Sequence, residues 1–169
     1  MINVDILIFT IALLGVVLGL VNLWYSQEAR RVRLRVIPKL AFDVEGGRYT
    51  TSEWNKYSKR LQDDSAAKRW TIEVVNLSSF GLTIDEVGFS DKTVDGTFAM
   101  MNPELSRKRT WPVRLRPHAK AIFYSTDGVL LPPPVWANPY AYVKTDCGQC
   151  VYGKSPVLEH VAANKALQS

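Results

Sequence analysis

Two cysteines and two histidines carry the most specific chemistry in this chain. Cys147 and Cys150 form a CxxC pair, and the histidines stand at positions 118 and 160. A redox CxxC opens a helix, whose N-terminus lowers a thiol pKa, whereas this pair flanks Gly148-Gln149 between two strand-like segments. We therefore expect ordinary reduced cysteines. The alternatives, in order, are a hairpin disulfide, a zinc site that combines Cys147, Cys150, His118 and His160, and redox catalysis.

Other catalytic patterns are missing from the sequence. It contains no GxSxG, phosphate-binding loop, HExxH or dinucleotide fingerprint, and these motifs mark the common hydrolases, metalloproteases and nucleotide enzymes. Asp63-Asp64 and Asp85-Glu86 are paired acids, and solvation explains both pairs. We expect no enzyme, no cofactor and no metal.

An apolar segment near the N-terminus sets the class of the protein. The chain has 169 residues and a net charge of +5, yet Ile6 to Tyr25 contains no formal charge over twenty residues. That length matches the ~20 residues that cross a bilayer. We predict a short exposed N-terminus at 1–5 and a transmembrane helix at 6–26. A cleaved signal peptide would need a basic start, a shorter apolar run and a small-residue cleavage site, and bulky Trp24 and Tyr25 stand there instead.

Basic residues follow the apolar segment and none precedes it. Residues 27–34 form a basic juxtamembrane segment, and the positive-inside rule then places the N-terminus outside and the C-terminal domain in the cytoplasm. Each basic residue near an anionic bilayer contributes ~1 kcal/mol to binding. We therefore expect contact with anionic lipid headgroups from five residues: Arg30, Arg31, Arg33, Arg35 and Lys39.

Small residues inside the apolar segment share one helix face. Ala12, Gly15 and Gly19 follow at spacings of three and four. Such spacing lets two helices approach closely in lipid, so a homo-oligomer through the helix is one interpretation. The other is that glycine is simply common in membrane helices.

After the anchor the hydrophobic period changes to two, which is typical of strands with one buried face. We predict strands over 32–44, 70–77, 82–89, 119–124, 140–145 and 150–154, with an edge or bend at Pro38 and a bulge between Ile84 and Val87. Thr50 and Glu53 fit a capping box that would open a short helix. Ser155-Pro156 fits the start of a tail helix. These elements predict a β-sandwich domain over 35–154 and a C-terminal tail helix over 155–169.

A second basic cluster lies within this domain. Nucleic-acid binding needs exposed aromatics between such charges, and only Trp111 falls inside the cluster. We expect a solvated loop first, then lipid headgroups or an acidic protein, and no nucleic acid. Its residues are Arg107, Lys108, Arg109, Arg114, Arg116 and Lys120.

The strand pattern resembles a known class of domain. Ile72-Glu73-Val74-Val75-Asn76-Leu77 with Leu82-Thr83-Ile84, and Leu115-x-Pro117 ahead of Ile122-Phe123-Tyr124, resemble immunoglobulin-like domains of bacterial surface and accessory proteins. The whole chain looks like bacterial or phage-type proteins with a single anchor and one such domain. The resemblance implies a mainly β, immunoglobulin-like antiparallel sandwich behind one transmembrane helix, and a role in binding or scaffolding.

Two classes of function follow. The first is a single-pass membrane-anchored binding or scaffolding protein that presents its β-sandwich to a protein partner, or the structural protein of a virion with an internal membrane. The second is a metal-dependent or redox protein built on cysteine and histidine. We expect the first.

Overall fold

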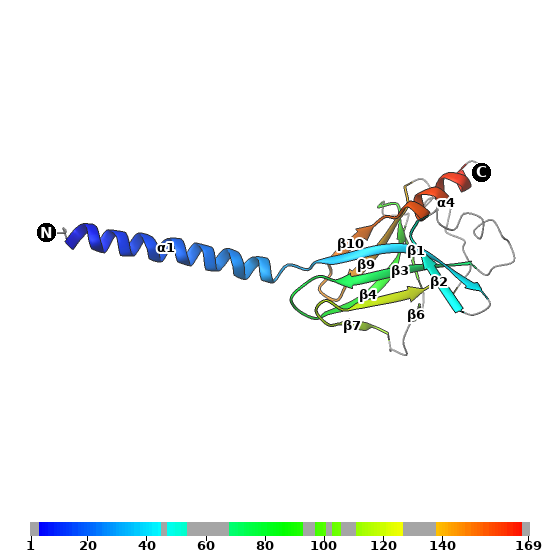
Figure 1. Ribbon diagram of the computed structural model, residues 1–169, viewed down its shortest axis with the longest axis horizontal. Helices are drawn as coiled ribbons and strands as arrows, with labels where there is room; N and C mark the ends of the chain where they lie inside the picture. The colour runs from blue at the N-terminus through cyan, green and yellow to red at the C-terminus, as the bar shows by residue number, and fades with distance from the viewer. Residues whose placement is uncertain are drawn as a thin grey trace.

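The structure is a long helix that projects from a β domain (Figure 1). It is a computed structural model that describes residues 4–44, 47–53, 68–92, 97–100, 103–105, 111–126 and 138–166. Helix α1 spans Val4–Ala29 and helix α4 spans Pro156–Ala166. The N-terminus and the C-terminus lie at opposite ends of the molecule (Figure 1). The fold is mainly β, with one N-terminal apolar helix and one short C-terminal helix.

Helix α1 is apolar on every side from Ile6 to Tyr25, and of its length only the last turn meets the described part of the domain. Within it, Ile8–Ala29 is long and apolar enough to cross a membrane, and none of that span is buried in the domain. The helix covers the predicted 6–26 and continues three residues further. Residues 27–29 are therefore helical, and only residues 30–33 separate α1 from the first strand. The connection between helix and domain is shorter than the sequence predicted.

The first sheet contains the strand that follows α1. Its order is β2 (Gly47–Thr51), β1 (Leu34–Val44), β3 (Lys68–Asn76), β8 (Lys120–Tyr124) and β6 (Glu104–Leu105), and all pairings are antiparallel. Strand β2 pairs with β1 only from Leu40 onward. Among the described strands, Pro38 therefore lies where β1 has a sheet neighbour on one side only, which suits a residue without an N–H.

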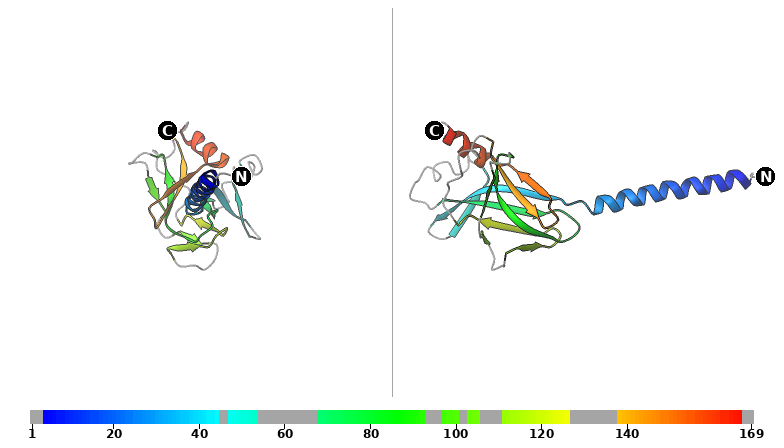
Figure 2. Two further views of the ribbon diagram at one scale, coloured as in Figure 1. Left: turned by 90° about the vertical axis from the view of Figure 1, so that its left-hand side faces the viewer. Right: turned by 180° about the vertical axis from the view of Figure 1, so that it is seen from behind.

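The second sheet runs in the order β10 (Cys150–Gly153), β9 (Tyr140–Thr145), β4 (Leu82–Ser90) and β5 (Thr97–Ala99). Strand β7 (Val113–Leu115) also pairs with β4. The β4–β9 register shifts between Ile84 and Glu86, so the predicted bulge is confirmed. Both sheets are curled (Figure 2).

The core lies between the two sheets and is closed by α4. Trp70 of β3 and Phe89 of β4 meet edge to face at 5.5 Å between ring centroids. In β1 the even-numbered side chains Val36, Leu40 and Phe42 are buried, as the period of two predicts. Helix α4 contributes Val157 and Leu158 to the same core.

Two predicted helix starts have different outcomes. The Ser155 hydroxyl accepts a hydrogen bond from the Leu158 N–H at 3.4 Å, so the predicted N-cap of the tail helix is confirmed. The capping box at Thr50 is wrong, because Thr50 belongs to strand β2. There the neighbouring Thr51 hydroxyl bonds the backbone of Glu53 and closes a turn. The rest of the predicted short helix, after Glu53, lies outside the described residues.

Candidate functional site

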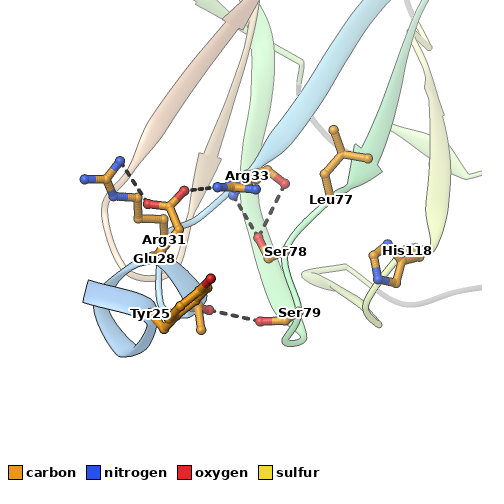
Figure 3. Close-up of a pocket in the computed structure, with 9 residues that line it drawn as sticks. Tyr25, Glu28, Arg31, Arg33, Leu77, Ser78, Ser79 and His118 are labelled. Carbon is orange, nitrogen blue, oxygen red and sulfur yellow. Dashed lines mark hydrogen bonds and ion pairs between the residues drawn. The ribbon is translucent and has the colours of Figure 1, made fainter. Parts of the chain in front are cut away.

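A cavity of about 300 Å³ opens where α1 meets the β domain (Figure 3). We call it the junction cavity. Its walls come from the last turn of α1, the link to β1, the β3–β4 turn and the β7–β8 turn. The lining residues are Tyr25, Glu28, Ala29, Arg31, Arg33, Leu77, Ser78, Ser79 and His118.

A small ion-pair cluster forms one wall of the cavity. Arg31 Nη1 lies 3.1 Å from Glu28 Oε2, and Arg33 Nη2 donates to the other oxygen of the same carboxylate. The Arg31 and Arg33 side chains are 70% and 54% exposed, and exposed ion pairs are worth only about 0–1 kcal/mol each. Two arginines against one glutamate leave a net charge of +1, on guanidinium groups that remain accessible from solvent.

The β3–β4 turn holds the link between helix and domain. Arg33 N donates to Ser78 Oγ at 2.8 Å, and Leu77 N donates to Arg33 O at 2.7 Å. Ser79 Oγ donates to the carbonyl of Ala29 at 2.9 Å. That carbonyl belongs to the last turn of α1, where carbonyls lack a partner within the helix. Hydrogen bonds at both ends of the link therefore fix the end of α1 against the domain.

Asn76 organises the two turns that line the cavity. It is fully buried, and its Nδ2 lies 2.8 Å from Phe80 O, 3.3 Å from Leu115 O and 3.2 Å from Arg116 O. Its Oδ1 accepts a hydrogen bond from Ser78 N at 2.9 Å. One side chain thus joins the β3–β4 turn to the β7–β8 turn.

The β7–β8 turn contributes His118 to the cavity and carries Arg116 of the second basic cluster two residues earlier. Arg116 and His118 are exposed in this turn, and His118 lines the cavity with a φ of 57°. Arg114 is exposed on β7, next to this turn. From the sequence, His118 was expected only as a candidate metal ligand. Arg107, Lys108 and Arg109 lie outside the described residues.

Three of the other predicted basic residues lie on the outer face of the first sheet. Arg35 and Lys120 are both paired with Val75, one from each side, and both are exposed. Lys39 instead binds Glu73, with Nζ and Oε2 3.0 Å apart and side chains only 18% and 11% exposed. Breaking so buried a pair to reach a lipid would leave Glu73 uncompensated, so the headgroup contact predicted for Lys39 does not fit its surroundings.

The four residues of the alternative zinc site are not brought together as a metal-binding group. Cys147 and Cys150 are free, exposed thiols in the β9–β10 hairpin. His118 lines the junction cavity, whereas His160 belongs to helix α4. Among the described residues, no group of three or more histidine, cysteine or acidic side chains could hold a metal ion.

A tyrosine cluster on the outer face of the second sheet was not anticipated. Tyr142 lies beside Tyr152, at 6.4 Å between ring centroids, and donates its hydroxyl to Glu86. Burial, and then this hydrogen bond, raise the pKa of Tyr142 above its ordinary value. The Lys92 ammonium stands 4.0 Å from the centre of the Tyr140 ring. Strand alternation could have placed these tyrosines on one face, but not the lysine above them.

Comparison with known proteins gives no relative. The chain matches no protein-family model, no curated protein and no solved structure.

Proposed function

We propose that this protein is a single-pass membrane-anchored binding or scaffolding protein that presents a β domain at the membrane surface. One observation carries the proposal: α1 points away from the domain (Figure 1) and leaves its large apolar side chains exposed. Each large apolar side chain left in water costs about 1.5–3 kcal/mol, so the exposed helix would cost on the order of 20 kcal/mol. A bilayer removes that cost.

The orientation we propose puts the domain in the cytoplasm and the N-terminus outside. Arg30, Arg31, Arg33 and Arg35 follow the helix, and no Lys or Arg precedes it. The positive-inside rule counts residues at this distance from a helix end. Ala12, Gly15 and Gly19 supply a face for a second helix, because a Cβ added at either glycine would meet nothing within 4 Å.

We further propose that the domain is an immunoglobulin-like sandwich whose surface binds a protein. Two antiparallel sheets enclosing one core support that fold. The tyrosine cluster supports the binding role, since Tyr152 is 41% exposed and tyrosine is enriched where proteins bind one another. Lys92 and Lys154 above Tyr140 would favour an acidic partner.

Two measurements on the full chain test the anchoring and its direction. Alkaline carbonate should leave the protein in the membrane pellet, because an integral helix resists extraction that releases peripheral proteins. Alkaline phosphatase fused after Ser169 should be inactive in intact bacterial cells, while a fluorescent protein at the same site should fold. Replacing Arg30, Arg31, Arg33 and Arg35 with Glu should weaken the preference for a cytoplasmic C-terminal domain, so that some phosphatase activity appears in intact cells. Carbonate release would overturn the anchor, and phosphatase activity outside the cytoplasm would overturn the orientation.

A further inference from the structure

We propose that the junction cavity binds the phosphate group of one anionic phospholipid. This inference rests on the membrane anchoring proposed above and names a ligand for the site at the end of the anchor. Three observations support it: the position of the cavity relative to the bilayer, the charge of its arginines and glutamate, and its apolar wall.

The cavity lies at the depth of the lipid phosphates. Residues 6–25 rise 1.5 Å each, which fills the ~30 Å hydrocarbon core. Trp24 and Tyr25 then fall at the boundary, where aromatic side chains anchor. Glu28 and Ala29 lie within about 6 Å beyond Tyr25 along the helix, inside the headgroup layer of ~5–7 Å on each side.

The charge of the cavity fits a phosphodiester. Arg31 and Arg33 against Glu28 leave +1, which one phosphodiester charge neutralises. A guanidinium presents two parallel N–H donors that match phosphate oxygens. The Glu28 carboxylate occupies the two arginines in the absence of a lipid. A lipid phosphate can replace it at little cost, because both ion pairs of Glu28 are exposed at the surface.

The remaining wall favours a lipid over free phosphate. Tyr25, Ala29 and Leu77 line the same cavity as the arginines (Figure 3). Leu77 is 45% exposed in the β3–β4 turn, although the neighbouring Ser78 is buried. Glycerol and the first acyl carbons of a phospholipid would cover this apolar surface, whereas inorganic phosphate would not.

Native mass spectrometry of the full chain, purified in detergent, tests the inference. The probes are phosphatidylglycerol, phosphatidylcholine and inorganic phosphate. The wild type should retain one phosphatidylglycerol in preference to phosphatidylcholine. Arg31→Gln with Arg33→Gln should weaken that binding about 30-fold, since two basic residues at ~1 kcal/mol each correspond to ~2 kcal/mol at 1.4 kcal/mol per tenfold.

Two control variants make the test specific. Arg48→Gln with Arg69→Gln removes the same charge from two arginines that share Glu104 and lie opposite the C-terminal end of β1, away from α1, so it should leave phosphatidylglycerol binding within about threefold. Glu28→Gln removes the internal competitor and should strengthen binding. Circular dichroism checks that each variant is folded.

Several results would overturn the inference. These are equal retention of the two lipids, equal loss in both double variants, weaker binding by Glu28→Gln, or displacement of the lipid by millimolar inorganic phosphate. The last result would assign the cavity to a soluble phosphate instead. A protein that resists carbonate extraction but shows no lipid preference would refute this inference and leave the anchoring intact.

Discussion

Replacing Asn76 should loosen the whole helix-proximal end of the domain. The Nδ2 group has two hydrogens to share among the carbonyls of Phe80, Leu115 and Arg116, and Oδ1 accepts one hydrogen bond from Ser78 N. Asn76→Ala removes three hydrogen bonds at about 1 kcal/mol each, so it should lower the free energy of unfolding by about 3 kcal/mol. At ~3 °C per kcal/mol for a domain of this size, the melting temperature should fall by about 9 °C.

The measurement is thermal unfolding of the full chain in detergent, followed by tryptophan fluorescence. Asn76→Asp keeps the size of the side chain but points a carboxylate at three carbonyl oxygens. It should therefore cost more than Asn76→Ala, because a buried charge without a partner is penalised further. Asn138→Ala is the matched control, since Asn138 is exposed and its Oδ1 accepts a hydrogen bond from the Lys154 ammonium at 3.2 Å. It should change stability by less than about 0.5 kcal/mol.

One result would refute this reasoning. If Asn76→Asp were as stable as the wild type, Asn76 could not be donating to the three carbonyls. The two turns that line the junction cavity would then be held together by other contacts.

Three further predictions concern other parts of the domain. Gly153→Ala should cost about 3 kcal/mol, since the added Cβ would lie 1.9 Å from a β1 carbonyl oxygen, whereas Gly81→Ala, with 3.5 Å to its nearest neighbour, should be nearly neutral in urea unfolding. Because the pKa of Tyr142 is raised in the folded state, the unfolding free energy should fall as pH rises above its usual value of 10; Tyr142→Phe should flatten that fall, and an unchanged pH profile would contradict it. Cys147→Ser with Cys150→Ser should leave carbonate resistance unchanged and cost under ~0.5 kcal/mol, as both thiols are exposed; stoichiometric zinc in the purified wild type would contradict this.

The sequence predicted the longer strands because their hydrophobic period is strong enough to read alone. Strands β1, β3, β4 and β9 each run six residues or more. Strands β5 and β7 have three residues each, too few for a period to show, and both exist through their pairing with β4. Strand β2 was missed because Thr50 is equally suited to a helix cap and to a strand.

The candidate site was predictable only in its cationic half. Arg31 and Arg33 stand next to the apolar segment in the sequence, so their position beside the end of α1 follows from spacing alone. The contribution of His118 does not, since it depends on a side-chain contact between Asn76 and the carbonyl of Arg116, forty residues apart. Ser78 and Ser79 predicted a turn, but nothing in the sequence indicated that their hydroxyls would form hydrogen bonds with the end of α1 and the link that follows it.

The short link between α1 and β1 affects how the domain would resist a pulling force. In the anchored state proposed above, a force between the bilayer and the far end of the domain would enter through residues 30–33 and run lengthwise along β1. Strand β1 is paired with β3 over nine consecutive positions, from Leu34 opposite Asn76 to Phe42 opposite Lys68. Antiparallel hydrogen bonds lie perpendicular to the strands, so such a pull would load all of them in shear together instead of opening them one at a time. A tether built in this way would yield late and abruptly under tension.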